Sequence, residues 1–359
     1  MTITPLRAGI VGLGVGKAHV HGYRLSPDVE LAAVCDMNRE RLETTANELN
    51  VAWRFTDYHN MLAEADLDIV SICLPNSLHA EASIAALEAG VHVICEKPMA
   101  ITSAEAHRMI TAAEQHNRRL MVAYNFRYRP DTRWLYRVVQ TGQLGTIYRV
   151  DATWRREIGI PGSGWFGNLA MAGGGALIDL GVHVLDLSLW MLGFPEATTV
   201  SGEIQTLFGP GARKTRGRKP GDILPNSFDV EDSAAGFIRL ATGTTIHLHA
   251  SWAEHAQPQD DRIRLELQGT EGTAVLTIPN YRNDDTLRMY TEIAGEPVTV
   301  IPTVRLDGPA GHEALVADLV DSIQRELPAP TDGWQGLASV RILEALYESA
   351  RSGREVALV

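Results

Sequence analysis

Lys97 is the residue whose type and position point most directly to chemistry. It lies in Cys95-Glu96-Lys97-Pro98, directly after the apolar run at residues 91–94. That run is typical of a short strand buried in a parallel sheet. The carboxyl ends of such strands border the crevice in which open α/β sheets bind ligands. We therefore expect an ammonium group beside a bound ligand, as in an enzyme; a surface ion pair with Glu96 is the alternative.

A second group of reactive side chains lies at residues 176–190, within a helix predicted at residues 175–192. Most of these residues are apolar, but Asp179, His183 and Asp186 recur at i, i+4 and i+7 and share one face. A surface helix shows the opposite pattern, a narrow apolar stripe on a polar body. Two interpretations fit. The three side chains satisfy one another as a structural network, or they face a ligand pocket.

A glycine-rich turn at residues 12–16 joins a predicted strand to a predicted helix. Its residues are Gly12, Leu13, Gly14, Val15 and Gly16. Glycines at such a junction let the backbone approach a pyrophosphate, whose charge the helix N-terminus favours. The spacing is one residue shorter than G-x-G-x-x-G, so a plain tight turn is the alternative.

Asp36 strengthens the case for a dinucleotide. It ends the second predicted strand, about 20 residues after the glycines, where an acid can hold the ribose hydroxyls. A carboxylate there repels a 2′-phosphate, so NAD is favoured over NADP. The nearby Arg39 and Arg41 weaken this preference without removing it.

The elements that must position these residues alternate between strand and helix over the first 124 residues. Strands are predicted at residues 6–11, 30–35, near 51, 68–74, 91–95 and 120–123. Helices are predicted at residues 17–23, 38–49 with Asn38 as N-cap, 77–89 ending at Gly90, and 103–116. Strands separated by helices of this length form a parallel, doubly wound sheet.

The rest of the chain has mainly strand character. Strands are predicted at residues 145–156, 199–205, 232–240, 244–252, 262–268 and 274–278. Besides the segment at residues 175–192, helices are predicted at residues 313–324 and 335–352. We place the boundary before Asn125, which gives domains at residues 1–124 and 125–359. The C-terminal helix could pack back on the first domain.

Composition fits a two-domain globular enzyme. A chain of 359 residues is too long for one ordinary core, and its 45% hydrophobic and 21% charged residues are normal proportions. The net charge of -12 argues against nucleic acid or an anionic membrane as main partner. We see no signal peptide and no apolar run long enough to span a bilayer. Cys35, Cys73 and Cys95 follow or lie in predicted buried strands, which favours reduced thiols and a cytoplasmic location.

At these residues the chain resembles the Gfo/Idh/MocA oxidoreductases, NAD(P)-dependent dehydrogenases of sugars and cyclic polyols. Glu96-Lys97-Pro98 together with the downstream Asp-x-Gly-x-His at residues 179–183 is the specific signal. The other matching stretches are residues 12–19, 74–79, 173–175, 230–232, 269–272 and 356–358. The resemblance covers nearly the whole chain. It implies a Rossmann domain followed by an α+β domain with a large, open, mostly antiparallel β-sheet.

The resemblance favours a catalytic role for the polar helix face. It implies hydride transfer from a secondary alcohol carbon to NAD, with His183 as general base and Lys97 stabilising the oxygen. Asp179 would hold the substrate or orient His183. The roles of Lys97 and His183 could be exchanged, since a desolvated lysine can also act as a base.

The expected ligand contacts follow from the same motifs, and no metal is expected. The cofactor-binding residues are Gly12, Leu13, Gly14, Val15, Gly16, Asp36, Arg41, Leu74, Pro75, Asn76, His79, Glu96, Lys97 and Asn125. The substrate-binding residues are Lys97, Arg127, Trp154, Arg155, Trp165, Asp179 and His183. His79 could instead be only a helix-start residue, and the aromatic and arginine residues could be ordinary packing residues. We expect an uncharged sugar or polyol as substrate.

Two features resemble binding sites, but another interpretation of each is favoured. His247 and His249 alternate on one strand face, where a hydrated or interface face is favoured over a metal site. Ile246, Leu248 and Trp252 line the opposite face. The basic run at residues 213–219 reads as a solvated loop, or as a contact with a neighbouring subunit.

Two other functions share this pattern. One is an NAD-dependent glycosidase, which turns over without net NADH; the other is a non-catalytic sensor. A sensor would be expected to lose the pair Lys97 and His183, which this chain keeps. The resemblance also implies a homo-dimer or homo-tetramer formed through the C-terminal sheet, because an open sheet needs its exposed face covered.

Overall fold

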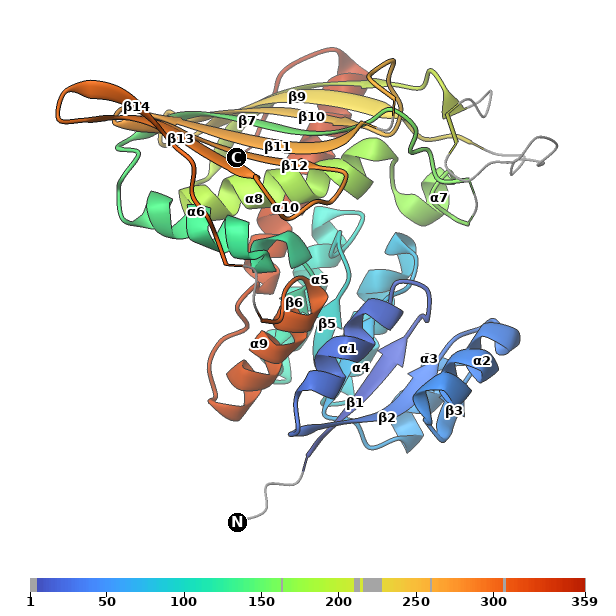
Figure 1. The fold of residues 1–359 in the computed structure, drawn as a ribbon. Helices are drawn as coiled ribbons and strands as arrows, with labels where there is room; N and C mark the ends of the chain where they lie inside the picture. Colours follow the sequence, from blue (N-terminus) through green and yellow to red (C-terminus); the bar gives the residue numbers. More distant parts are fainter. Residues whose placement is uncertain are drawn as a thin grey trace. The chain divides into compact units, whose positions relative to one another are not determined.

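The computed structural model describes residues 5–162, 164–209, 214–215, 228–258, 260–305 and 308–358. They form two compact units, whose elements are labelled in Figure 1. Unit 1 contains residues 5–128 and 308–340, and unit 2 contains the described residues of 129–305 and 341–358. The boundary predicted before Asn125 assigned everything after it to the second domain. In the structure, residues 308–340 return to the first unit.

Unit 1 is built on a six-stranded parallel sheet. Its strands are β1 (Leu6–Val11), β2 (Val29–Cys35), β3 (Trp53–Phe55), β4 (Ile69–Ile72), β5 (His92–Cys95) and β6 (Leu120–Val122). They lie in the order β3-β2-β1-β4-β5-β6, and every neighbouring pair is parallel. This is the doubly wound sheet predicted from the sequence, with the strand order of dinucleotide-binding domains.

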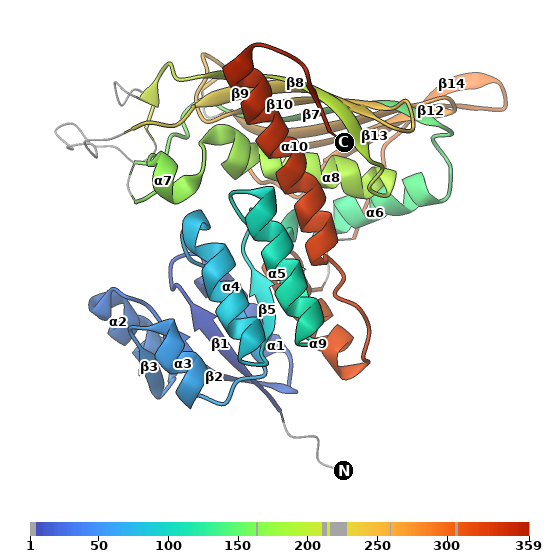
Figure 2. The same ribbon diagram turned by 180° about the vertical axis from the view of Figure 1, so that it is seen from behind.

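Helices cover both faces of this sheet. They are α1 (Lys17–Leu25), α2 (Arg39–Leu49), α3 (Tyr58–Glu64), α4 (His79–Glu88), α5 (Ser103–Gln115) and α9 (His312–Gln324), with the short 3₁₀ turns η1 (Asn76–Leu78) and η2 (Asn125–Tyr128). Figure 1 shows α1 and α9 side by side on one face, and Figure 2 shows α4 and α5 on the other. Gly22 permits the first packing, since a Cβ on it would lie 2.6 Å from Cβ of Val316.

Local capping signals explain several helix starts in unit 1. Asn38 caps α2 by accepting a hydrogen bond from the N–H of Arg41. Thr102 and Glu105 form a capping box at the start of α5. Helix α3 was missed because it has only 7 residues and buries Met61 alone, so it carries no apolar periodicity.

Unit 2 is built on a nine-stranded sheet. Its strands are β7 (Ile147–Arg156), β8 (Ala197–Gln205), β9 (Ser233–Leu240), β10 (Thr245–Ser251), β11 (Asp261–Gly269), β12 (Gly272–Pro279), β13 (Leu287–Ile293), β14 (Glu296–Val300) and β15 (Val356–Ala357). Their order is β14-β13-β12-β11-β7-β10-β9-β8-β15. Only β7 and β10 pair in parallel; the other pairs are antiparallel. The predicted mostly antiparallel sheet is confirmed, although β13, β14 and β15 were not predicted as strands.

Helices pack on one face of the second sheet. They are α6 (Pro130–Gln140), α7 (Leu169–Ala172), the π-helical turn η3 (Leu177–Gly181), α8 (Val182–Leu192) and the far half of α10 (Gly333–Ser352), whose first residues belong to unit 1. Ile246, Leu248 and Ala250 of β10 are buried on this face. A Cβ on Gly236, which pairs with Leu248, would meet Leu346 of α10 at 2.7 Å. Residues of β10 therefore alternate between this buried face and a more polar one up to Ala250.

The helical run at the centre of unit 2 corrects one sequence-based expectation. We expected no apolar run long enough to span a bilayer. Among the described residues, Leu169–Leu192 is long and apolar enough by length and composition. Most of it is buried inside unit 2, as is typical of a core helix.

The three cysteines agree with the expectation of buried thiols. Cys35, Cys73 and Cys95 are all free and buried. Burial raises the pKa of Cys35 and of Cys95 to about 12, so both thiols are protonated and unreactive.

Candidate active site

The glycine turn after β1 closes tightly against its neighbours in unit 1. The N–H of Gly12 donates to the carbonyl of Cys35 at 2.8 Å, and its φ is 90°. A Cβ on Gly12 would lie 2.2 Å from the carbonyl oxygen of Cys73. A Cβ on Gly16 would lie 2.2 Å from the carbonyl oxygen of Gly12. Only glycine fits at these two positions.

Gly14 needs a different explanation. It is exposed, its φ is not left-handed, and a Cβ on it would have no protein atom within 4 Å. Packing therefore does not require glycine here. A ligand that approaches the backbone just before α1 would require it, and a pyrophosphate bound at a helix N-terminus is such a ligand. The turn, with the exposed Val15 beside Gly14, fits a dinucleotide.

Asp36 ends β2 beside this turn and is 5% exposed. Its carboxylate accepts hydrogen bonds from the N–H of Leu13 at 2.9 Å and of Asn38 at 2.8 Å. The guanidinium of Arg41 donates two more, at 2.8 and 3.1 Å. Burial raises the pKa of Asp36, but these bonds outweigh it and hold the pKa below its usual range. Asp36 is therefore ionised, at the strand end where an acid holds the ribose hydroxyls in dinucleotide-binding domains.

The loop after β4 contains four more of the predicted cofactor residues. Leu74 and Pro75 are half-buried, and Asn76 is buried in η1. His79 begins α4, with Nε2 2.8 Å from the carbonyl oxygen of Leu74 and Nδ1 2.7 Å from that of Pro98. His79 therefore connects the loops that follow β4 and β5. This structural role does not depend on a contact with the cofactor.

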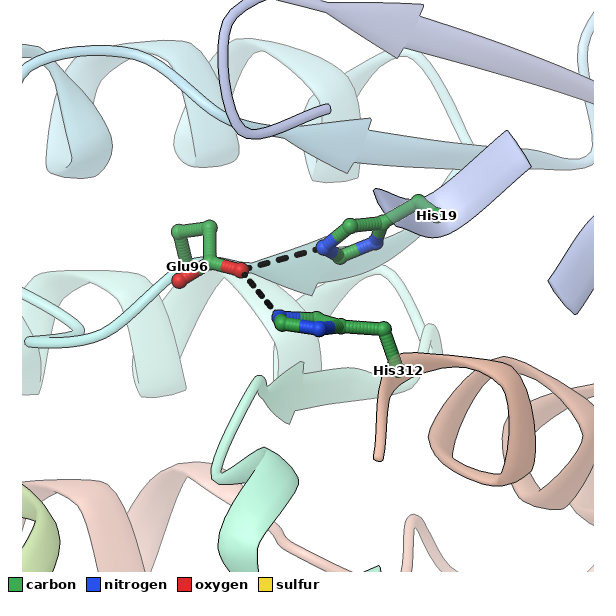
Figure 3. Close-up of side chains that lie close together, drawn as sticks. All are labelled: His19, Glu96 and His312. Carbon is green, nitrogen blue, oxygen red and sulfur yellow. Dashed lines mark hydrogen bonds and ion pairs between the residues drawn. The ribbon is translucent and has the colours of Figure 1, made fainter. Parts of the chain in front are cut away.

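Lys97 follows β5 at the carboxyl edge of the same sheet. Its side chain is half-buried, its peptide bond to Pro98 is cis, and its N–H donates to Oε2 of Glu96 at 3.1 Å. Glu96 is 5% exposed, and its Oε1 lies 3.1 Å from Nε2 of both His19 and His312 (Figure 3). Among the described residues, His19, Glu96 and His312 are the one group spaced as metal ligands.

Asn125 and Arg127 lie in η2, at the end of the first stretch of unit 1. The N–H of Asn125 donates to the carbonyl of Ala123 at 2.9 Å. Arg127 is 3% exposed; its guanidinium donates to Gln335 at 2.5 Å and lies 5.2 Å from the ring centre of Tyr124. Arg127 thus packs inside unit 1.

In unit 2, Asp179 and His183 come from one helical run. Asp179 lies in η3, where Trp252 donates its indole N–H to Oδ2 at 2.9 Å. His183 lies in the first turn of α8, 7% exposed, with its ring centre 5.3 Å from that of Trp154. Because η3 is π-helical, the regular spacing assumed from the sequence does not hold across this run. Asp186 is buried, with 1% exposed.

The strand face beneath this run adds a buried charged group. Trp154 and Arg156 of β7 both donate to the carboxylate of Asp261, at 2.9 and 3.0 Å. The guanidinium of Arg156 lies 5.1 Å from the ring centre of Trp154. Burial lowers the pKa of Arg156, but the charges of Tyr281, Asp179 and Asp261 outweigh it and raise the pKa. Arg156 is therefore a fixed cation in electrostatic contact with Asp179.

Arg155 is not brought into this group. Successive residues of a strand point to opposite faces, so Arg155 lies on the other side of the sheet from Trp154 and Arg156. There it pairs with Glu254 at 3.3 Å. Arg155 was predicted as a substrate contact, but strand alternation places Arg156, and not Arg155, on the face of Trp154.

The polar face of the sheet also carries the two histidines weighed as metal ligands. Nδ1 of His247 lies 3.0 Å from Asp151, and Nε2 of His249 lies 3.3 Å from Glu254. The acidic partners come from other segments, which is why spacing along the strand did not reveal them. Neither histidine belongs to a metal-ligand group within the described part of the chain.

The structure describes only part of two predicted loop features, the contact of Trp165 and the basic run at residues 213–219. Trp165 is half-buried and stacks on Phe166, with ring centres 4.2 Å apart. Of the basic run at residues 213–219, only Lys214 and Thr215 are described, and Lys214 pairs with Glu157 at 3.1 Å. The other residues of that run lie outside the described ranges.

The start of the helical run that bears Asp179 is anchored by a buried carboxylate. Glu231 accepts hydrogen bonds from the N–H of Gly175 at 2.8 Å, from the N–H of Leu177 at 2.9 Å and from the hydroxyl of Tyr347 at 2.9 Å. A Cβ on Gly174 would lie 2.0 Å from the hydroxyl oxygen of Tyr347, so this close approach requires glycine.

Comparison with known proteins agrees with these features. Residues 6–124 match the model of an oxidoreductase family with an NAD-binding Rossmann fold, and residues 132–275 match the GFO/IDH/MocA C-terminal domain. The D-glucoside 3-dehydrogenase of Escherichia coli K12 is 34% identical over 361 residues, covering 100% of this chain and 99% of that protein. The chain belongs to the GFO/IDH/MocA oxidoreductase family.

Two further relatives extend the comparison. The levoglucosan dehydrogenase of Pseudarthrobacter phenanthrenivorans is 31% identical over 303 residues, covering 79% of this chain and 76% of that protein. A solved levoglucosan dehydrogenase in complex with NADH has a TM-score of 0.85 and 26% identity, covering 99% of this chain and 100% of that one. As a GFO/IDH/MocA protein, this chain is an NAD-dependent oxidoreductase acting on CH–OH groups.

Sequence reasoning missed several residues that the tertiary structure places beside the predicted ones. They are His312 beside Glu96, Trp252 on Asp179, Arg156 and Asp261 beside Trp154, and Tyr347 on Glu231. Alternation along β7 was a usable signal for Arg156. Nothing in the sequence connects residue 312 with residue 96.

Proposed function

We propose that the protein oxidises a secondary hydroxyl of a sugar, with Lys97, Asp179 and His183 as its catalytic residues. The observation that carries the proposal is the pair Asp179 and His183 on one helical run, each held by a buried tryptophan of the strand face. In a family member that binds NAD, such a preorganised acid and imidazole suit proton transfer from an alcohol.

Each residue has one task in this scheme. NAD supplies the hydride acceptor when it is bound. His183 takes the hydroxyl proton on its imidazole, and the ammonium group of Lys97 donates a hydrogen bond to the same oxygen and stabilises the negative charge that develops. Asp179, held by Trp252, binds a substrate hydroxyl or orients His183. The exchanged assignment, with Lys97 as base, is tested below.

The proposed ligand contacts follow the predicted lists with one change. The cofactor is held by the turn at residues 12–16, Asp36, Arg41, Leu74, Pro75, Asn76, His79, Glu96, Lys97 and Asn125. On the substrate side, Arg127, Trp154 and Trp165 stay in the proposal. Arg156 replaces Arg155, because it lies on the same face of β7 as Trp154, whereas Arg155 lies on the opposite face. The relatives' names, a D-glucoside dehydrogenase and a levoglucosan dehydrogenase, support an uncharged glucose-like ring as substrate.

The test is NADH formation with D-glucosides, levoglucosan, aldoses and inositols, with NAD and NADP supplied in parallel. We expect a D-glucoside or levoglucosan to give NADH with NAD. Lys97→Ala and His183→Ala should each lower kcat/KM on the order of 10²–10⁴-fold. NAD binding without NADH formation from any sugar would contradict the proposal, and turnover of a glycoside without net NADH would favour a redox glycosidase.

The choice of base needs a separate measurement. If His183 is the base, His183→Ala loses the limb of the kcat/KM profile that reports its titration, whereas Lys97→Met keeps that limb at a lower rate. The reverse pattern would assign the base to Lys97.

A cytoplasmic homo-dimer or homo-tetramer formed through the second sheet completes the proposal. The polar sheet face presents half-buried charged pairs such as Arg155 with Glu254, which an interface between copies could cover. Light scattering should give a dimer or tetramer. Arg264 of β11 pairs with Glu266 on the same face as Arg155. Reversing Arg155 and Arg264 to glutamate should give monomers, and a monomeric parent protein would contradict the sheet interface.

A further inference from the structure

Three segments far apart in the sequence meet at one buried carboxylate in unit 1. His19 comes from α1, Glu96 from the loop after β5 and His312 from the first turn of α9. Figure 3 shows both imidazoles directed at the same carboxylate oxygen, Oε1 of Glu96, each with Nε2 at 3.1 Å. The second oxygen, Oε2, accepts the N–H of Lys97 at 3.1 Å. The carboxylate is thus bonded on both sides.

The hydrogen bonds continue inward from His19 in a consistent direction. Nδ1 of His19 lies 3.0 Å from Oγ of Ser71, and that oxygen lies 2.7 Å from the hydroxyl of Tyr23. If Tyr23 donates to Ser71 and Ser71 donates to Nδ1, then His19 is neutral and Nε2 carries the proton given to Glu96. Each of these hydrogen-bond donors, from Tyr23 through Ser71 to His19, then has an acceptor without a bound ion.

Glu96 supplies a negative charge to the cluster. Burial raises the pKa of Glu96, but the hydrogen bonds from His19 and His312 outweigh it and hold the pKa well below its usual range. Burial lowers the pKa of His19, so that imidazole is neutral. The other titratable groups facing Glu96 are Cys73, Cys95 and His79. Burial raises the pKa of both thiols, so they are neutral, and burial lowers the pKa of His79.

Resting on the role proposed above for Lys97, we propose that His312 is a positioning residue of the hydride-transfer site. It donates the hydrogen bond that, with the one from His19, holds the Glu96 carboxylate ionised and oriented toward the N–H of Lys97. Helix α9 thereby sets the backbone from which Lys97 reaches the substrate, although it is more than two hundred residues away in sequence.

A divalent metal is the competing explanation, because the three ligand atoms lie within 4.8 Å of one another. The observed geometry favours hydrogen bonds. Both Nε2 atoms contact one oxygen at hydrogen-bond distance, and Ser71 supports His19 with a weak hydroxyl rather than with the carboxylate or carbonyl usual behind a metal-bound imidazole.

The first test compares His312→Leu with His312→Gln. Leucine removes the donor, whereas the side-chain amide of glutamine places an N–H close to the position of Nε2. We expect His312→Leu to lower kcat about tenfold or more, to change KM for NAD by less than about threefold, and to move the acid limb of the kcat profile to higher pH. His312→Gln should recover at least a third of the lost activity. His107→Leu, at an exposed histidine of α5, is the control for general effects.

Equal activity of His312→Leu and parent would overturn the proposal. So would equal losses in both His312 variants together with a lower Tm, because a merely structural role does not distinguish glutamine from leucine. Elemental analysis gives a third outcome that would overturn the proposal: a stoichiometric divalent ion in the purified protein that is lost in His312→Gln.

A second measurement separates this inference from the role of Lys97. Nitrogen-15 spectra of histidine-labelled protein should show His19 neutral and protonated at Nε2 at pH 7, and an N–H on Nε2 of His312 whose signal moves in Glu96→Gln. That outcome supports the hydrogen-bonded cluster even if Lys97→Ala proves active, in which case the proposed function fails and the positioning role, which acts through Lys97, fails with it. If the nitrogen-15 shift of His312 is the same in Glu96→Gln as in the parent protein, the positioning role is overturned, independently of the activity of Lys97→Ala.

Discussion

The indole N–H of Trp252 donates a hydrogen bond of 2.9 Å to Oδ2 of Asp179. Trp252 is fully buried at the end of β10, and Asp179 lies in the π-helical turn before α8. The strand face thus fixes the direction of a carboxylate on a helix packed against it. A rigid donor of this kind suits a group that must hold a substrate hydroxyl or an imidazole in place.

Replacing Trp252 by phenylalanine should separate this hydrogen bond from packing. We expect Trp252→Phe to remain folded and to lose kcat/KM on the order of 10- to 100-fold, because Asp179 is no longer held in position. Steady-state kinetics and a thermal melt measure the two effects. Trp334→Phe, at an exposed tryptophan of unit 1, is the matched control. Parent-like activity in Trp252→Phe would show that the orientation of Asp179 does not limit the reaction.

Gly14 and Gly16 offer a paired test of the cofactor turn. A Cβ at Gly14 meets no protein atom within 4 Å, whereas one at Gly16 lies 2.2 Å from the carbonyl oxygen of Gly12. Gly14→Ala should keep the Tm of the parent but weaken NAD binding roughly tenfold or more, a loss of about 1.4 kcal/mol. Gly16→Ala should lower Tm. Fluorescence titration with NADH measures the binding, and unchanged affinity in Gly14→Ala would exclude a close pyrophosphate.

The Glu231 carboxylate should contribute strongly to the free energy of unfolding, because it holds the start of the helical run that contains Asp179. Glu231→Ala leaves the buried N–H groups of Gly175 and Leu177 without their acceptor, which should lower the free energy of unfolding by roughly 2–5 kcal/mol. Tyr347→Phe removes one donor and should cost about 1 kcal/mol. Urea unfolding of both single variants and the double variant measures the coupling. Additive losses would show that Tyr347 does not act through Glu231.

Acid should destabilise the protein in two steps. Burial lowers the pKa of His19, His79 and His92, in His92 to about 4. The unfolded chain therefore takes up protons first, and stability falls as the pH drops from 6.5 towards 4. Below about 4.5, protonation of Glu96 and Asp36 in the unfolded chain should lower stability further, since their folded pKa values are depressed. Glu231, whose pKa burial raises, takes up its proton in the folded state above about 4.5 and therefore opposes the first step.

A melt series from pH 8 to pH 4 checks the first step. The Tm should be flat down to about pH 6.5 and then fall. His92→Asn should reduce the slope, because an asparagine oxygen can accept the N–H of Arg119 that Nδ1 of His92 accepts at 2.9 Å, without titrating. A Tm that rises on acidification through this range would contradict the buried neutral histidines.

Much of unit 1 follows from local sequence. Periodic apolar runs, the Asn38 cap and the glycine that ends α4 locate five of its strands and most of its helices. Strands that alternate regularly with helices favour a parallel sheet. Short elements escaped because they bury too little to show a period. Helix α3 buries Met61 alone, and β15 has two residues.

The candidate site also contains residues that local sequence predicted and residues that only the tertiary structure revealed. Motifs of contiguous residues identified Gly12 to Gly16, Asp36, Glu96 with Lys97, and Asp179 with His183, because each side chain is placed by its own strand end or helix. The partners Trp252, Arg156, Tyr347 and His312 come from other elements, and only tertiary packing brings them within hydrogen-bond distance. The sequence by itself determined which groups could react. The tertiary structure decided which donors hold them, since burial makes each such contact obligatory and no local pattern encodes it.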